Sequence, residues 1–231
     1  MKENIQIHGG DLISKVLLRH NIDWIFTLCG GHISPILTGC ETIGIQVIDV
    51  RNEATAVFAA DSISRLSGKI GVAVVTAGPG LTNTITAIKN AQLAQVPILI
   101  LGGATATVLK NRGSLQDIDH ISVVQSITKY TKSIKRVRDL QPSLEEAISM
   151  ATSGVRGPVY LEIPVDLLYP ESLVREWYGL KSNGKSMPWW MNRYLNWNVN
   201  RIFKNKNKFF PKKNIIKDYH HFSHHIRRVS K

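Results

Sequence analysis

Ile45-Gln-Val-Ile-Asp-Val50 is followed directly by Arg51-Asn-Glu-Ala-Thr-Ala-Val-Phe-Ala-Ala60. The first segment is apolar and β-branched, which is typical of a buried strand. The second is rich in small residues, which is typical of a helix packed closely against its neighbour. Glu53 therefore lies where a strand ends and a helix begins, at the edge where open α/β sheets bind ligands. This position predicts a buried acid facing a ligand, although an acid in the first turn of a helix is also favoured by the helix dipole.

Two later segments repeat this architecture. Ile70-Gly-Val-Ala-Val-Val75 predicts a second buried strand, followed by a glycine turn and a helix through Asn90. Pro97-Ile-Leu-Ile-Leu101 predicts a third strand, which ends at Gly102-Gly103. Strands that alternate with helices indicate a parallel sheet with helices on both faces. We therefore predict one α/β domain over residues 1–180.

The turn Thr76-Ala-Gly-Pro-Gly-Leu-Thr-Asn83 carries the most specific glycine pattern. It lacks the Gly-Lys-Ser/Thr ending of a phosphate-binding P-loop. It also lacks the third glycine and the later acid of a dinucleotide fingerprint, and Pro79 removes one backbone amide. Two interpretations remain: close approach of the backbone to a ligand or a neighbouring helix, and a tight structural turn.

Several motifs in the same order resemble the N-terminal, pyrimidine-binding domain of thiamine-diphosphate-dependent enzymes of the acetolactate synthase type. The resemblance covers roughly residues 7–180. The motifs that carry it are Phe26-Thr-Leu-Cys-Gly-Gly-His-Ile-Ser-Pro35, Arg51-Asn-Glu-Ala54, Ala59-Ala-Asp-Ser-Ile-Ser-Arg-Leu-Ser-Gly68, Thr76-Ala-Gly-Pro-Gly-Leu-Thr-Asn83, Asn90-Ala-Gln-Leu-Ala-Gln-Val-Pro97, Asn111-Arg-Gly-Ser-Leu-Gln116 and Gly157-Pro-Val-Tyr-Leu-Glu-Ile-Pro-Val-Asp-Leu-Leu-Tyr-Pro170.

The resemblance implies a catalytic role for Glu53. The matching glutamate of the family hydrogen-bonds N1′ of the aminopyrimidine of thiamine diphosphate, which favours the imino form whose 4′-nitrogen removes the thiazolium C2 proton. The cofactor then serves as nucleophile and electron sink. A glutamine at this position would keep a hydrogen bond but would not supply a carboxylate of suitable basicity.

The resemblance implies weaker roles for other residues. Cofactor-binding positions beside Glu53 are expected to shape the pocket rather than take part in the chemistry; they are Gly78, Pro79, Gly80 and Asn83. Gln116 matches a substrate-side glutamine, although family members often have Phe-Gln-Glu where this chain has Leu115-Gln116-Asp117. Gly31 and His32 lie in the first strand-to-helix loop, and we place them on the substrate side by the sheet-edge rule. His20 and His120 receive no functional assignment, and no residue is predicted to bind a metal.

The family binds the cofactor's diphosphate through Mg²⁺ on a separate C-terminal domain with a Gly-Asp-Gly motif, which this sequence does not contain. The resemblance therefore implies a truncated member that depends on a homo-oligomer or a full-length relative for that domain. The expected activity is carbon–carbon cleavage of 2-hydroxyacyl-CoA. Carboligation of 2-oxo acids and a non-catalytic interaction module remain alternatives.

Charge divides the chain at about residue 181. Residues 1–180 hold 16 Lys and Arg against 16 Asp and Glu, whereas residues 181–231 hold 13 against one and account for the net charge of +12. We predict that residues 181–231 are a linker remnant and a disordered basic tail. Contact with a membrane surface is an alternative for its tryptophans and cations, while nucleic-acid binding is not expected.

Cys29 and Cys40 form no CxxC motif, which favours reduced, buried thiols. No stretch reaches the roughly 18 apolar residues of a membrane span, and Met1-Lys-Glu-Asn-Ile5 is too polar for a signal peptide. Related family members act at the endoplasmic reticulum membrane, so the sequence leaves open whether this chain lies there or in the cytoplasm.

Overall fold

The structure is a computed structural model that describes residues 8–180 and 187–205. Its centre is a sheet of six parallel strands in the order β2-β1-β3-β4-β6-β5. The strands are β1 (Trp24–Thr27), β2 (Gln46–Asp49), β3 (Gly71–Val75), β4 (Ile98–Ala104), β5 (Tyr130–Ser133) and β6 (Val159–Pro164). The predicted α/β class and parallel sheet are confirmed.

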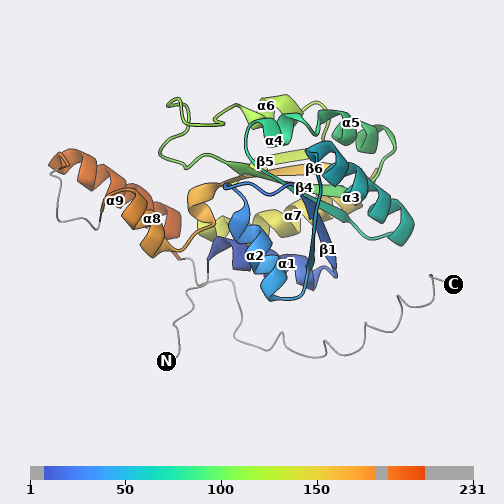
Figure 1. Ribbon diagram of the computed structural model, residues 1–231, viewed down its shortest axis with the longest axis horizontal. Coiled ribbons are helices and arrows are strands. Elements are labelled where there is room, and N and C mark those ends of the chain that lie inside the picture. The colour runs from blue at the N-terminus through green and yellow to red at the C-terminus, as the bar shows by residue number, and fades with distance from the viewer. Residues whose placement is uncertain (1–7, 181–186, 206–231) are drawn as a thin grey trace.

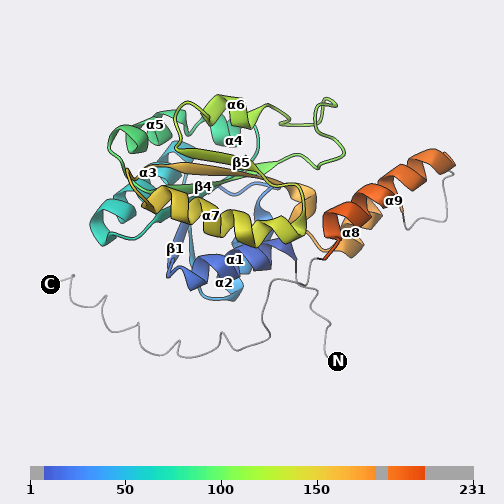
Figure 2. The same cartoon turned by 180° about the vertical axis from the view of Figure 1, so that it is seen from behind.

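Helices cover both faces of the sheet (Figures 1 and 2). One face carries α1 (Gly9–Arg19), α2 (Ser34–Thr42) and α7 (Leu140–Thr152), and α7 is preceded by the 3₁₀ turn η1 (Val137–Asp139). The other carries α3 (Glu53–Ser67), α4 (Pro79–Thr82), α5 (Ile85–Leu93) and α6 (His120–Val124). A second 3₁₀ turn, η2 (Val165–Leu167), follows β6.

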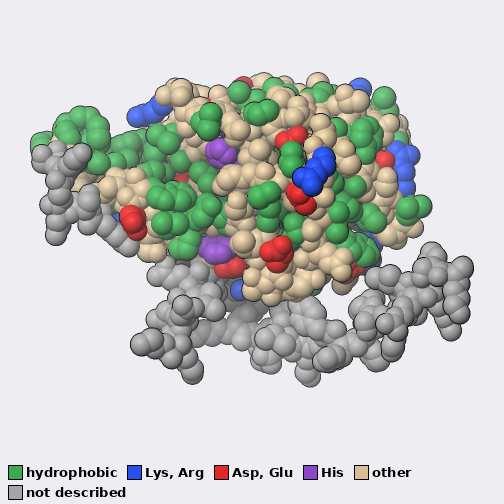
Figure 3. Space-filling view, in the orientation of Figure 1, with side chains coloured by type: hydrophobic (Ala, Val, Ile, Leu, Met, Phe, Trp, Pro, Cys, Tyr) green, Lys and Arg blue, Asp and Glu red, His purple; other side chains and the backbone are tan. Residues whose placement is uncertain are grey.

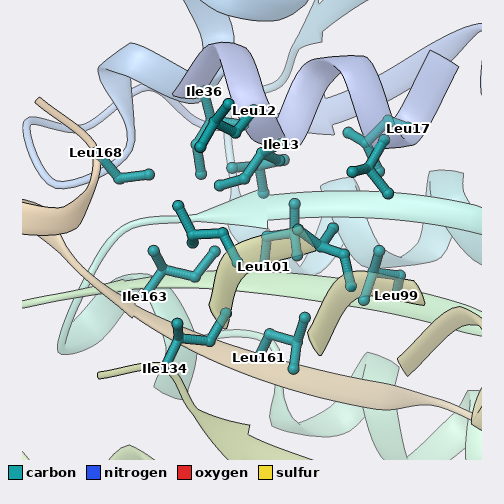
Figure 4. Packing of buried hydrophobic residues seen from close by; sticks show 14 of the residues in the cluster. Leu12, Ile13, Leu17, Ile36, Leu99, Leu101, Ile134, Leu161, Ile163 and Leu168 are labelled. Atoms are coloured by element: carbon teal, nitrogen blue, oxygen red, sulfur yellow. The ribbon is translucent and has the colours of Figure 1, made fainter. Parts of the chain in front are cut away.

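Successive side chains along each strand point to opposite faces of the sheet, and each face has its own hydrophobic core. Figure 4 shows Leu12, Ile13 and Leu17 of α1 packed toward strand residues such as Leu99 and Leu161. The neighbouring strand residues point the other way, so that Ile98, Ile100 and Tyr160 belong to the core beneath α3 and α5. Burial on both faces explains why β3 and β4 are mainly apolar and why β6 is apolar apart from Glu162.

The expectation of a buried strand at residues 45–50 is wrong in one respect. The strand forms over Gln46–Asp49, but Gln46, Ile48 and Asp49 are exposed and Val47 is half-buried. The reason is the strand order, because β2 is an edge strand paired only with β1. An edge strand can hold apolar, β-branched residues without being covered on both faces.

The helix after β2 packs directly on the sheet, as its small residues predict. A Cβ atom on Gly71 would lie 1.9 Å from the carbonyl oxygen of Ala60, so the backbones of α3 and β3 touch. Ala56, Val57 and Ala60 are fully buried in this contact. The close approach fixes the helix that begins with Glu53.

Two helices follow the sheet, α8 (Glu171–Trp177) and α9 (Trp189–Phe203). The predicted disorder of the region after residue 180 does not hold for α9, because Val199, Ile202 and Phe203 join the core on the α7 face. Figure 3 shows apolar side chains gathered at this end of the molecule, and Trp189, Trp190 and Trp197 of α9 are exposed. The linker at residues 181–186 and the Lys- and His-rich end of the predicted tail lie outside the described residues.

Candidate functional site

Glu53 is a buried carboxylate at the carboxyl edge of the sheet. It is the first residue of α3, and the preceding Asn52 caps the helix by accepting a hydrogen bond from the amide of Ala54 at 2.8 Å. The Glu53 side chain is only 7% exposed. Nδ2 of Asn83 donates to its Oε2 at 2.9 Å. The cap and this hydrogen bond hold the carboxylate in one position.

The glycine turn after β3 brings the backbone up to that carboxylate. Gly78 has φ 63° and ψ −116°, a conformation that side chains with a Cβ atom strongly disfavour. A Cβ atom on Gly80 would lie 2.6 Å from Cγ2 of Thr76 and 3.8 Å from Oε1 of Glu53. Any residue larger than glycine at position 80 would therefore fill the space beside the Glu53 carboxylate. The short helix α4 begins at Pro79, within the same turn.

Gln116 reaches the same place from the long loop after β4. A Cβ atom on Gly78 would lie 2.9 Å from Cβ of Gln116, and Gln116 itself has φ 63°. Since Glu53, Gly78 to Gly80 and Gln116 meet at one sheet edge, their predicted clustering is confirmed. Their assigned roles remain predictions.

His32 borders this cluster, whereas Gly31 does not contact it. Nδ1 of His32 lies 3.4 Å from Oγ1 of Thr76, two residues before Gly78. Burial and, to a smaller extent, the nearby His120 lower the pKa of His32. This favours a neutral imidazole. Gly31 is exposed, and a Cβ atom placed on it would have no atom within 4 Å.

His120 supports the glycine turn, although the sequence analysis gave it no role. It begins α6 and is 1% exposed. The backbone N–H of Gly78 donates to its Nε2 at 2.8 Å, and its Nδ1 lies 3.1 Å from Oε2 of Glu162. Because Nε2 accepts a hydrogen bond, Nδ1 must carry the proton and donate it to the carboxylate. Glu162 thus selects the tautomer that holds Gly78.

Glu162 lies on β6 with no side-chain exposure and is surrounded by donors. Besides His120, Nζ of Lys110 donates to Oε1 at 2.7 Å and Oγ of Ser133 donates to it at 2.6 Å. Burial raises the pKa of Glu162, but the hydrogen bonds from His120, Lys110 and Ser133 outweigh it and lower the pKa to about 2. The carboxylate is therefore a charged anchor beneath the glycine turn.

The depressed pKa of Glu162 predicts a loss of stability in acid. Its ordinary value is 4.5 and its folded value about 2, so its contribution is complete above pH 4.5 and is lost as the pH falls toward 2. We expect the free energy of unfolding to drop by about 3 kcal/mol across this range from this group alone. Urea unfolding at a series of pH values measures the drop.

The matched variants are Glu162→Gln and, at an exposed position, Glu41→Gln. The first should flatten the acid limb of the stability curve, and the second should leave it unchanged. An acid limb of equal slope in wild type and Glu162→Gln would contradict the assignment.

One of the two cysteines differs from expectation. Cys40 is buried, and burial first, then Glu41, raises the pKa of its thiol to about 12. Cys29 is exposed, which corrects the prediction of two buried thiols, because it lies in the loop after β1 rather than within an element.

Within residues 8–180 and 187–205, no group of three or more His, Cys, Asp or Glu side chains is arranged to hold a metal ion. In the same part of the chain, no helix combines the length and hydrophobicity needed to cross a bilayer.

A parallel sheet with a buried glutamate and a glycine turn at its carboxyl edge is the arrangement that the resemblance to the pyrimidine-binding domain of thiamine-diphosphate-dependent enzymes implies. Residues 7–123 match the family described as "Thiamine pyrophosphate enzyme, N-terminal TPP binding domain", and the chain belongs to this family.

The relatives that match are longer proteins. The chain is 53% identical over 193 residues to 2-hydroxyacyl-CoA lyase 2 of Homo sapiens, an alignment that covers 81% of this chain and 30% of that protein. It is 50% identical over 193 residues to 2-hydroxyacyl-CoA lyase 2 of Danio rerio, covering 81% and 31%. A probable acetolactate synthase of Mycobacterium bovis is 38% identical over 160 residues, covering 69% and 29%. The chain thus spans about a third of the length of these relatives.

Proposed function

We propose that this chain supplies the pyrimidine-binding half of a thiamine-diphosphate-dependent active site that cleaves a carbon–carbon bond of 2-hydroxyacyl-CoA. The observation that carries the proposal is the Glu53 carboxylate, buried beside the Gly78–Gly80 turn. The names of the relatives at about 50% identity support the substrate class.

The residues present fit the aminopyrimidine of the cofactor. Glu53 has one oxygen, Oε2, committed to Asn83, while Oε1 faces the space that a Cβ atom on Gly80 would fill. Oε1 would be the oxygen available to share a proton with N1′ of the pyrimidine ring, accepting a hydrogen bond from N1′ in the imino form. When bound, thiamine diphosphate supplies an electron sink for the cleaved bond.

Other residues of this chain would position Glu53 and the glycine turn for this chemistry. Asn83 fixes the carboxylate, and the glycine turn gives the pyrimidine ring access to it. His120, locked by Glu162, holds the turn from behind through Gly78. Gln116 and His32 border the same edge and are our candidates for the substrate side.

The diphosphate and Mg²⁺ would be bound elsewhere. In the family this is the task of a domain with a Gly-Asp-Gly motif, and the 231 residues of this sequence contain none. We propose that a second copy of a longer form, or a full-length relative, supplies that domain across the edge that bears Glu53.

A second candidate is carboligation of 2-oxo acids, which is favoured by the relative named as a probable acetolactate synthase. Both reactions would use Glu53 in the same way. A third candidate function is that of a non-catalytic subunit built on this fold.

The test is complementation. The purified 231-residue chain, given thiamine diphosphate, Mg²⁺ and a 2-hydroxyacyl-CoA, should release no aldehyde above a protein-free control. Addition of a chain that carries the diphosphate-binding domain, with its own pyrimidine-domain glutamate replaced by glutamine, should restore aldehyde release.

The same mixture given a 2-oxo acid separates the two reactions, because carboligation would yield an acetohydroxy acid in place of an aldehyde. Turnover by the 231-residue chain alone would overturn the dependence on a partner. Absence of any product in the complemented mixture would favour the non-catalytic subunit.

A further inference from the structure

We propose that a groove at the carboxyl end of β5 binds a phosphate group of a small molecule. The groove has a volume of about 550 Å³ and is separate from the Glu53 cluster. Its lining includes Lys132, Ser133, Lys135, Arg136, Ser143 and Arg201. Its volume falls within the range of about 300–1,000 Å³ that is usual for small-molecule sites.

Positive charge dominates the lining, with four cationic side chains against one carboxylate. Two of the cations have acidic partners, since Lys132 lies 2.7 Å from Glu146 and Arg136 lies 2.8 Å from Asp139. Such exposed pairs contribute little stability and are open to competition from a dianion. Lys135 and Arg201 are exposed, and Arg201 comes from α9, which is distant in sequence from the other lining residues.

A buried hydroxyl in the lining lacks a partner. Ser143 is 1% exposed, and its Oγ forms no hydrogen bond in the described part of the chain. A polar atom left unpaired away from water is unfavourable, so it marks a place where a ligand or water is expected to bind. Ser143 lies in the first turn of α7, a helix of 13 residues whose positive end also favours an anion.

Phosphate is the anion that best matches these groups. Its oxygens accept from Lys and Arg and also from a hydroxyl, and a dianion gains most from several converging cations. A long polyanion such as a nucleic acid would instead need a continuous basic surface, whereas the cations here line one groove of about 550 Å³.

The groove lies on the same sheet edge as Glu53. β5 is three strands from β3, a distance of about 14 Å at the usual strand spacing. Ser133 lines the groove and also donates to Glu162, which supports the Gly78 turn through His120. If the proposed function holds, the phosphates of a coenzyme A substrate are one source of the ligand. That identification rests on the proposed function, whereas free inorganic phosphate is an independent source.

The experiment is calorimetric titration of the full 231-residue chain with adenosine 3′,5′-bisphosphate, inorganic phosphate and adenosine. Binding of the bisphosphate, with none of adenosine, is expected. If inorganic phosphate binds as tightly as the bisphosphate, the site takes free phosphate; if the bisphosphate binds more tightly, the site takes the nucleotide.

Substitutions of the lining residues test whether the bisphosphate binds in the groove. Lys135→Ala and Arg201→Ala should each weaken it about tenfold, and Ser143→Ala should weaken it several-fold while thermal unfolding shows an intact fold. Lys89→Ala on α5 removes the same charge on the other face of the sheet and should change affinity less than about twofold. Glu53→Gln should leave it unchanged, so the result does not depend on the cofactor chemistry.

Affinity that is unchanged by all three groove variants would place the binding on the basic residues after Lys204 and overturn the proposal. So would equal affinity for adenosine and its bisphosphate.

Discussion

Replacement of Glu53 by glutamine is expected to lower the turnover of the complemented enzyme by about 10²–10⁴-fold, the range typical of losing a positioned proton-transfer group. Glutamine keeps the size of the side chain and can still accept the hydrogen bond from Asn83 through its single amide oxygen. It cannot supply a carboxylate to N1′ of the pyrimidine. The rate of aldehyde release under saturating cofactor measures the effect, and the KM for the substrate should change far less than kcat.

Asp49→Asn is the matched control. Asp49 ends β2 only four residues before Glu53, but its side chain is exposed. The same loss of charge there should leave kcat within about twofold of the wild-type value, because exposed charges are strongly screened. A Glu53→Gln enzyme with nearly normal kcat would remove Glu53 from the chemistry and leave it as a helix-start residue.

Replacement of His120 by leucine is expected to destabilise the fold by about 2–4 kcal/mol, because a buried polar group that loses its hydrogen-bond partner costs about 1–3 kcal/mol and two such groups are affected. The change takes a donor from Glu162 and leaves the buried N–H of Gly78 without an acceptor. Lys110 and Ser133 still contact Glu162, which favours the lower end of this range. Urea unfolding followed by circular dichroism measures the loss.

His120→Gln separates packing from hydrogen bonding. A glutamine amide has both a donor for Glu162 and an acceptor for Gly78, so it should recover at least half of the stability that leucine loses. His20→Leu, at an exposed position, should cost less than about 0.5 kcal/mol. Equal stability of wild type and His120→Leu would show that the network does not hold the turn.

The central strands and the Glu53 cluster were predictable because their signals are local. β3 and β4 begin as continuous apolar runs; β3 is followed by the glycine turn and β4 contains Gly102 and Gly103 near its end, so both strands can be placed along the chain. Parallel strands then bring their carboxyl ends to one edge whatever their order. Glu53 and Gly78 could therefore be brought together without knowledge of the full topology.

Features that depend on strand order or distant contacts were not predictable. The exposure of β2 follows from its place at the edge of the sheet, which no local pattern reveals. His120 owes its role to Gly78 and Glu162, each 42 residues away. The buried acid in Val159–Pro164, a run that is otherwise almost wholly apolar, was the available signal, since a charge in a buried strand requires partners.

The helix α9 was missed for a different reason. Its high content of Asn, Arg and Trp resembles that of a solvated segment, and charge composition dominated the prediction. The spacing of Val199, Ile202 and Phe203 is nevertheless helical, and these three side chains form the face that is buried.

The contact between Gly71 and Ala60 has a mechanical consequence. Where two backbones touch directly, no side chain lies between them that could change rotamer and let the helix shift. α3 and β3 therefore move as one body, and the acid at the start of the helix keeps its distance from the turn at the end of the strand. Thermal motion within the domain would have to bend the sheet itself to separate Glu53 from Gly80. The distance between Glu53 and the glycine turn is thus set by main-chain contact and not by side-chain packing.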